Sequence, residues 1–269
     1  NPDFFQLAKW AGQVLRLAPQ DGRIHVVLAR TLVRGGRPAQ AAGEYRRALR
    51  KQPWATLSLT REIARALRKP THLAAAVRGD TLSETRLFSA LFALRRYKSI
   101  RELASELTLL QPAHPKAAVY WARACLQMQD APCVTTQLKR IRAQGAPLIA
   151  SGLNARLALQ QGQIDDARRI IEAGLVDDGA RNRVFLKHAL RVASQLGDRS
   201  LAMKIVDHLW TDSDGRTEDS MEALALKGRT EAIFKQHANA IRAYEQASAL
   251  GSRPQFMLAA ARSEVALGR

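Results

Sequence analysis

Cysteine is scarce in this sequence, with only Cys125 and Cys133 among 269 residues. Two thiols without a neighbouring histidine do not form a zinc site at any usual spacing, so a zinc-stabilised fold is excluded. The separation of the two residues would straddle a helix-turn-helix bend, and a disulfide is geometrically feasible in an oxidising compartment. Two separate thiols, buried as small hydrophobic side chains, are the preferred interpretation because free cysteine is among the most buried residue types.

Long apolar runs and the common catalytic motifs are also missing. No run reaches the 18 apolar residues that a membrane-spanning helix needs. The six histidines are dispersed, and neither Gly-x-Ser-x-Gly, Gly-x-x-x-x-Gly-Lys-Ser/Thr nor His-Glu-x-x-His occurs. Acidic pairs such as Glu102 with Glu106 fit a solvated helix surface better than acid–base catalysis. We therefore expect this region to be no enzyme and to hold no metal or cofactor, whatever a longer parent protein carries elsewhere. The compartment stays open between cytoplasm and periplasm.

Aromatic residues make up 6% of the chain, and the 24 acidic residues are outnumbered by 42 basic ones, which gives a formal net charge of +18. Ten of the basic residues are lysine and 32 are arginine, the side chain that pairs bidentately with carboxylate or phosphate. No basic cluster is interleaved with aromatic residues, which argues against base stacking on single-stranded nucleic acid. The 46% of hydrophobic residues suffice for a core and argue against intrinsic disorder. The composition thus predicts a folded, basic protein with an acidic partner.

A repeated helical pattern is the main positive feature of the sequence. Between Arg23 and Pro53, apolar or small residues fall on two helical stripes that are broken at Gly35 and Gly36. Pro19 precedes Pro53 by 34 residues. The length and the order Leu-Ala, Leu, Gly, Ala, Tyr, Ala, Pro resemble the tetratricopeptide repeat (TPR), a helix-turn-helix unit. The resemblance implies an all-α fold, a right-handed α-α superhelix (a TPR-like solenoid) of about seven helical hairpins plus flanking half-repeats.

Imperfect copies of this pattern recur along nearly the whole chain. Gly228, Tyr244 and Ala247 match the small, aromatic and small positions of the family. We expect one solenoid domain over residues 1–269, with hairpins at residues 21–53, 54–80 (degenerate), 81–112, 113–147, 148–180, 181–212 and 220–253, and half-repeats at 1–20 and 254–269. Helices are expected over 4–18 and 256–268, and a polar loop over 210–219. The two half-repeats suggest a fragment of a longer protein.

Each predicted repeat begins with a first helix, and in seven of these first helices an arginine directly follows the residue that packs against the neighbouring helix. These arginines are Arg30, Arg65, Arg123, Arg156, Arg191, Arg229 and Arg262. In the TPR family this position faces the concave groove, so the resemblance implies a ladder of guanidinium groups along one surface. The same resemblance implies six further groove residues, which are Arg23, Arg34, Lys116, Gln127, Lys187 and Gln195. The alternative is a solvated basic face without a ligand, because arginine stems cover apolar helix faces and acids of the same chain can pair with the ladder.

Most large aromatic side chains are expected in the core. Tyr45, Tyr244, Trp121 and Trp10 fall on the packing faces. Trp54 and Trp210 lie at repeat ends and are the exceptions.

Three functions remain open from the sequence. The first is a non-enzymatic protein–protein interaction scaffold that binds an acidic partner segment in a basic concave groove. The second is a TPR accessory module of a bacterial cell-envelope protein that makes or exports an acidic polysaccharide, or is attached to a glycosyltransferase, since similar arrays occur in such proteins. The third is non-specific nucleic-acid binding, supported by the high pI alone. The oligomeric state is not predicted.

Overall fold

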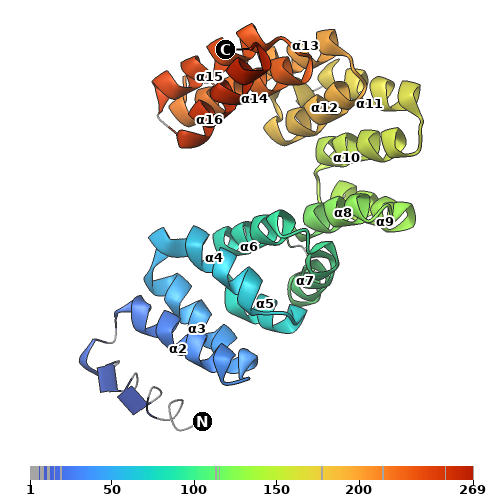
Figure 1. Cartoon of the computed structure of the whole chain (residues 1–269). Helices are drawn as coiled ribbons and strands as arrows, with labels where there is room; N and C mark the ends of the chain where they lie inside the picture. The colour runs from blue at the N-terminus through green and yellow to red at the C-terminus, as the bar shows by residue number, and fades with distance from the viewer. Residues whose placement is uncertain are drawn as a thin grey trace. The chain divides into compact units, whose positions relative to one another are not determined.

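A computed structural model describes residues 6, 9–10, 13–14, 16–18, 20–112, 114, 116–176, 178–213, 215–251 and 253–268. Over these residues the chain forms fifteen α-helices and two short 3-10 helices, and it contains no strand (Figure 1). None of the described helices combines the length and apolar character needed to cross a membrane. Of the helix expected over 4–18, residues 6, 9–10, 13–14 and 16–17 are described and helical, and residues 4–5, 7–8, 11–12 and 15 lie outside the described residues. The chain divides into two compact units, residues 1–137 (unit 1) and 138–269 (unit 2).

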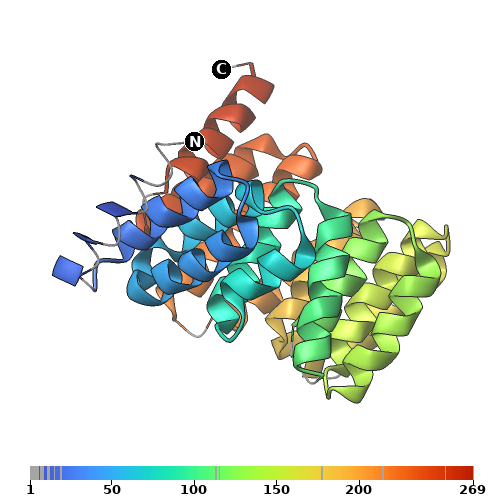
Figure 2. The same cartoon turned by 90° about the horizontal axis from the view of Figure 1, so that it is seen from below.

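Unit 1 is a stack of helical hairpins. Its helices are α2 (Gly22–Arg34), α3 (Pro38–Lys51), α4 (Thr56–Ala66), α5 (Pro70–Val77), α6 (Thr81–Ala93), α7 (Tyr97–Leu110), α8 (Ala117–Gln127) and α9 (Ala131–Ala143), with a 3-10 helix at Pro53–Ala55. The division from unit 2 falls within α9. First helices stack on first helices, as α4 does on α6, and second helices on second, as α3 does on α5 and α5 on α7 (Figure 2). Fully buried Tyr45, Ile63 and Phe88 belong to one continuous core.

Unit 2 repeats the same construction. Its helices are α10 (Pro147–Gln160), α11 (Ile164–Val176), α12 (Arg183–Gln195), α13 (Arg199–Thr211), α14 (Thr217–Ile233), α15 (His237–Leu250) and α16 (Pro254–Ala266), with a 3-10 helix at Asp178–Arg181. The polar loop expected over 210–219 is shorter than predicted. α14 begins at Thr217 instead, and Glu218 and Asp219 lie in its first turn, where acidic side chains complement the positive end of the helix dipole.

Six of the seven hairpins turn in the same way. The middle residue of a three-residue turn has a positive φ, and the next N–H donates to a carbonyl five residues earlier, as Gln236 does to Glu231 at 2.8 Å. This is the Schellman motif, which supplies donors to the free carbonyls at a helix end. The middle residues are Gly36, Arg95, Gln129, Gly162, Gly197 and Lys235.

The α4–α5 hairpin is the exception, and a distant arginine closes its first helix. Arg96, which immediately precedes α7, donates hydrogen bonds to the main-chain carbonyls of Ala64, Leu67 (3.1 Å) and Arg68 (3.3 Å). Burial, and then the charge of Arg68, lower the pKa of Arg96. The guanidinium nevertheless satisfies carbonyls at the C-terminal end of α4 that have no partner within the helix. The third hairpin therefore completes the hydrogen bonding of the second.

Cys125 and Cys133 form a disulfide, so the preferred interpretation of two separate thiols is wrong. Cys125 lies in the last turn of α8 and Cys133 in the first turn of α9, which brings their Cα atoms to 6.0 Å, a normal disulfide separation. Asp130, whose carboxylate lies within 4.8 Å of both sulfur atoms, accepts the Cys133 N–H at 3.1 Å. It also pairs with Arg101 at 3.5 Å. These contacts account for the three side chains without a metal ion.

The aromatic side chains divide between core and surface. Tyr45 and Tyr244 are buried, and Trp121 packs partly buried against the core of unit 1. Trp10 was expected in the core but is 52% exposed, so that prediction is wrong. Trp54 and Trp210 are exposed.

Candidate binding surface

Arg30, the first arginine of the predicted ladder, is held by an acid of the same chain. Its Nε and Nη2 donate to Oε1 and Oε2 of Glu62, each at 2.8 Å, in a bidentate pair between α2 and α4. Tyr45 of α3 donates to the same Oε1 at 2.9 Å. The hydrogen bond from Arg30 holds the pKa of Glu62 below its usual value, and burial raises the pKa of Tyr45. This network links three helices of unit 1 and occupies the fork of Arg30.

The other candidates in unit 1 have diverse surroundings. The Arg123 guanidinium lies over the rings of Phe92 and Tyr120, 4.7 and 5.2 Å from their centroids, in a cation–π arrangement. Arg23 pairs with Asp21 at 2.8 Å. Lys116 Nζ lies 3.4 Å from Thr85 Oγ1. The remaining candidates, all exposed, are Arg34, Arg65 and Gln127.

Arg156 in unit 2 is buried rather than exposed to a ligand, with 7% of its surface accessible. The cause is the close approach of α10 and α12, which meet at Gly152: a Cβ there would lie 2.8 Å from the Cβ of His188. Arg156 follows Gly152 by four residues and so lies on the same helix face. The exposed position that the resemblance implied for Arg156 is therefore corrected to a buried one.

In unit 2, Arg191 of α12 and Arg229 of α14 lie near enough for their charges to interact. Burial, and then the charge of Arg229, lower the pKa of Arg191. Burial raises the pKa of Tyr244, and the charge of Arg229 offsets only part of that rise. Both arginines are exposed, and neither forms an ion pair with an acid among the described residues. Gln195 and Arg262, two further exposed candidates of this unit, lie on α12 and α16.

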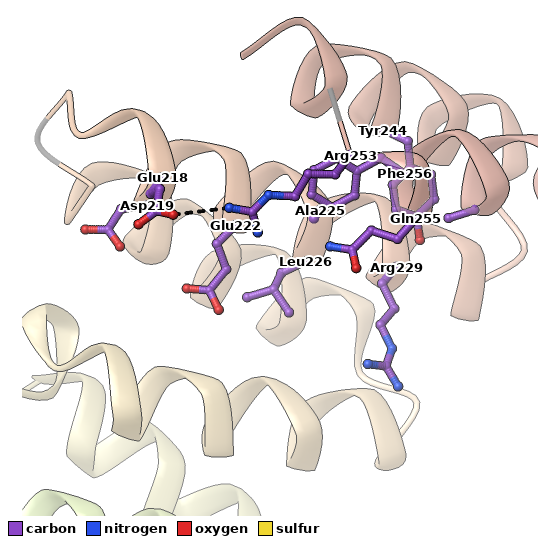
Figure 3. A pocket seen from close by; sticks show the side chains of 11 residues that line it. Glu218, Asp219, Glu222, Ala225, Leu226, Arg229, Tyr244, Arg253, Gln255 and Phe256 are labelled. Atoms are coloured by element: carbon purple, nitrogen blue, oxygen red, sulfur yellow. Dashed lines mark hydrogen bonds and ion pairs between the residues drawn. The ribbon is translucent and has the colours of Figure 1, made fainter. Parts of the chain in front are cut away.

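A pocket of about 530 Å³ adjoins Arg229 (Figure 3). Its apolar wall is formed by Ala225 and Leu226 of α14 and by Phe256 and Ala259 of α16. The other residues that line it are Glu218, Asp219, Glu222, Arg229, Tyr244, Arg253 and Gln255.

The carboxylates of this pocket are already paired. Figure 3 shows Glu218, Asp219 and Glu222 toward one end of α14 and Arg229 toward the other. The ion pairs are Glu218–Arg253 (3.2 Å), Asp219–Arg216 (2.9 Å), Asp219–Arg183 (3.4 Å), Glu222–Arg183 (3.3 Å) and Glu222–Lys187 (2.7 Å). Although burial raises the pKa of Glu222, Lys187 and Arg183 hold it below its usual value. The acids are thus neutralised, whereas Arg229 is not.

Lys187 was predicted as a groove residue, and the structure places it at this pocket through Glu222. Sequence reasoning missed Arg253, Gln255 and Phe256. Their one sequence signal is that Arg253 follows Glu218 by 35 residues, close to one repeat length, which allows a pair between consecutive first helices.

No protein-family model and no curated protein matches the sequence. Solved structures do match it. A tetratricopeptide repeat protein from Parabacteroides merdae is 16% identical, with a TM-score of 0.51 over 91% of this chain and 99% of that one. Yeast Tom70 is 13% identical, with a TM-score of 0.50 over 98% of this chain, which spans 58% of the Tom70 chain. The predicted fold class is therefore confirmed: the chain has a TPR-like helical repeat fold.

Proposed function

We propose that this chain is a non-enzymatic scaffold that binds an acidic segment of a partner protein on unit 2, with Arg191 and Arg229 as the anion anchors. The observation that carries the proposal is the proximity of these two guanidinium groups without an acidic partner, beside a pocket whose own carboxylates are paired. Binding through protein–protein contacts is the role that a TPR-like fold supports in general.

Repulsion between the two arginines favours an anionic ligand. Two like charges in a partly desolvated place destabilise the free protein, and a bound carboxylate removes that cost. A guanidinium fork binds a carboxylate bidentately, in short charge-assisted hydrogen bonds. One glutamate or aspartate between Arg191 and Arg229, or two in succession, would satisfy both groups.

The pocket adds an apolar requirement and a direction. Leu226 and Phe256 offer an apolar wall next to Arg229. A bulky apolar side chain adjacent to the acidic residue would fill the pocket and exclude water from the ion pair, which strengthens it. At the other end of the pocket, the arginines that pair with Glu218 and Asp219 are already engaged and are not available to a second anion. We therefore expect a segment that is acidic at one end only.

The proposal uses part of the predicted ladder. Arg30 is left out because Glu62 occupies it, and Arg156 because it is buried. Arg262 is exposed on α16, which also lines the pocket, and remains a predicted contact.

Competitive titration tests the proposal. The chain is titrated at physiological salt with a peptide that carries acidic residues beside a phenylalanine, a uronate oligosaccharide and a single-stranded oligonucleotide of equal charge. We expect the peptide to bind selectively, and Arg191→Gln with Arg229→Gln to weaken it about tenfold or more. The matched control, Arg142→Gln with Arg242→Gln, removes the same charge from two exposed arginines of unit 2 and should have little effect.

Other outcomes contradict the proposal in different ways. Unchanged peptide affinity in the Arg191/Arg229 variant would show that these two arginines do not bind the acidic segment. Equal binding of all three ligands that disappears with added salt would show that the +18 charge acts as a general polyanion surface. Selective binding of the uronate would replace the protein partner with an acidic polysaccharide.

A further inference from the structure

Three arginines of unit 1 that the TPR pattern did not single out gather between α3 and the turn after α5. Arg46 and Arg50 are four residues apart on α3 and share one helix face. Arg78 directly follows α5, which packs on α3. A Cβ built on Gly79 would lie 4.0 Å from Nη2 of Arg46, so the guanidinium of Arg46 reaches this turn.

Among the residues that the structure describes, the cluster has no internal partner. The Nε atom of Arg46 is buried and has no hydrogen-bond partner. No hydrogen bond or ion pair of the Arg50 and Arg78 side chains exists within the described part of the chain. In agreement with this arrangement, burial lowers the pKa of Arg46, and the charges of Arg50 and Arg78 lower it further. Arg50 and Arg78 are exposed and Arg46 is half-buried, so a solute can reach all three.

Nearby acids cannot neutralise the cluster because other groups already bind them. Glu44, two residues before Arg46, pairs with Arg47 and with His25. Asp80, two residues after Arg78, accepts the Leu82 N–H and the Ser83 hydroxyl at the start of α6.

Glu84 is the remaining acid near this turn, and it is engaged on both oxygens. Its Oε1 accepts the Gly79 N–H at 3.2 Å, and its Oε2 lies 2.7 Å from Nε2 of buried His114. Residues 20–100 contain seventeen basic and five acidic residues, and the other two acids, Asp21 and Glu62, pair with Arg23 and Arg30.

We infer that Arg46, Arg50 and Arg78 form an anion site for a doubly charged tetrahedral oxyanion, of the class of inorganic phosphate and phosphate monoesters. A carboxylate has two oxygens and one negative charge, too few to satisfy three guanidinium groups. A phosphate dianion offers three acceptor oxygens and close to two charges, which is the chemistry that arginine clusters bind. The site lies within unit 1, and it does not depend on the function proposed for unit 2.

Calorimetric titration of the full chain tests this site. The background is the Arg191→Gln/Arg229→Gln variant, which removes the other candidate anion anchors. Inorganic phosphate, glycerol phosphate and acetate are titrated at constant ionic strength and about pH 8, where phosphate is doubly charged. We expect phosphate to bind saturably, and acetate to bind at least about tenfold more weakly than phosphate. Binding of glycerol phosphate equal to that of phosphate indicates that the free anion suffices, and tighter binding indicates that the ester group is also recognised.

Substitutions within the cluster complete the experiment. Arg46→Gln with Arg78→Gln should weaken phosphate binding about tenfold or more, whereas Arg61→Gln with Arg86→Gln, two exposed arginines of the same unit, should leave it nearly unchanged. Arg50→Gln, which changes an exposed side chain only, should weaken binding without altering the helical circular dichroism. Affinity that survives the Arg46/Arg78 substitutions, equal binding of acetate, or a titration that does not saturate would overturn the inference.

Discussion

Gly228 of α14 lies against the ring of Tyr244 of α15, so closely that a Cβ on Gly228 would be 2.9 Å from Cδ1 and from Cε1. The two residues occupy the small and aromatic positions that the sequence pattern matched to the TPR repeat. The absence of a side chain on the first helix lets the aromatic ring of the second fill the hairpin. The same ring lines the unit 2 pocket beside Arg229.

Substitution of Gly228 by alanine is expected to destabilise unit 2 by about 1 kcal/mol or more, because overpacking outweighs the gain in helix propensity. Gly43→Ala is the matched control, since nothing lies within 4 Å of a Cβ there. That substitution should stabilise the protein by about 0.5–1 kcal/mol. Urea unfolding of both variants measures the two effects, and equal signs would contradict this account.

In the hairpin turns, we expect glycine to stabilise the protein relative to a residue with a side chain. Lys235 has φ +58°, in the left-handed region that favours glycine, whereas Gly197 occupies the equivalent position of the preceding hairpin. Lys235→Gly should stabilise the protein by up to about 1 kcal/mol, and Gly197→Ala should destabilise it by about the same amount. Thermal unfolding compares them. A loss of stability in Lys235→Gly would show that the lysine side chain has a role that outweighs its backbone strain.

The Arg30–Glu62 pair predicts a specific dependence on pH. The pKa of Glu62 is lowered below its usual value of 4.5, chiefly by the hydrogen bond from Arg30. The stability that the charged form contributes is therefore complete above pH 4.5 and is lost as the pH falls through the lowered pKa.

Glu62→Gln should cost about 1 kcal/mol near neutral pH, and the difference from the unmodified protein should shrink toward about pH 3. Urea unfolding at several pH values measures it. Glu245→Gln changes an exposed carboxylate that forms no ion pair with any described residue, and it provides the control, with a small, constant difference. A difference for Glu62→Gln that does not vary with pH would contradict the assignment.

The disulfide predicts a response to reductant. In the chain-entropy account, closing a loop as short as residues 125–133 contributes about 2–3 kcal/mol. Reductant should lower the Tm of the unmodified chain to that of Cys133→Ser and leave the variant unchanged. Thiol titration of the denatured, unreduced chain should find no free thiol. Two free thiols in that assay would show that the bridge does not form.

Helices and turns were accessible from the sequence because their causes are local. Glycines and prolines mark helix ends, and apolar residues at helical spacing mark the buried faces, so the TPR-like fold could be predicted. The partners and the burial of the arginine side chains could not be predicted. Arg30 meets an acid 32 residues away, and Arg156 is buried because Gly152 admits His188. Both outcomes depend on how neighbouring hairpins stack, which no spacing within one repeat reveals. The cluster of Arg46, Arg50 and Arg78 was missed for the same reason.

Arg96 gives unit 1 an order of disassembly. The carbonyls at the end of α4 depend on a side chain that belongs to the next hairpin, whereas the six hairpins with a Schellman turn close their own first helices. Unfolding of the third hairpin therefore exposes the end of the second, but fraying of the second leaves the turn of the third intact. Amide hydrogen exchange in α4 should consequently follow the opening of α6 and α7, so that protection in unit 1 is lost in one direction along the chain.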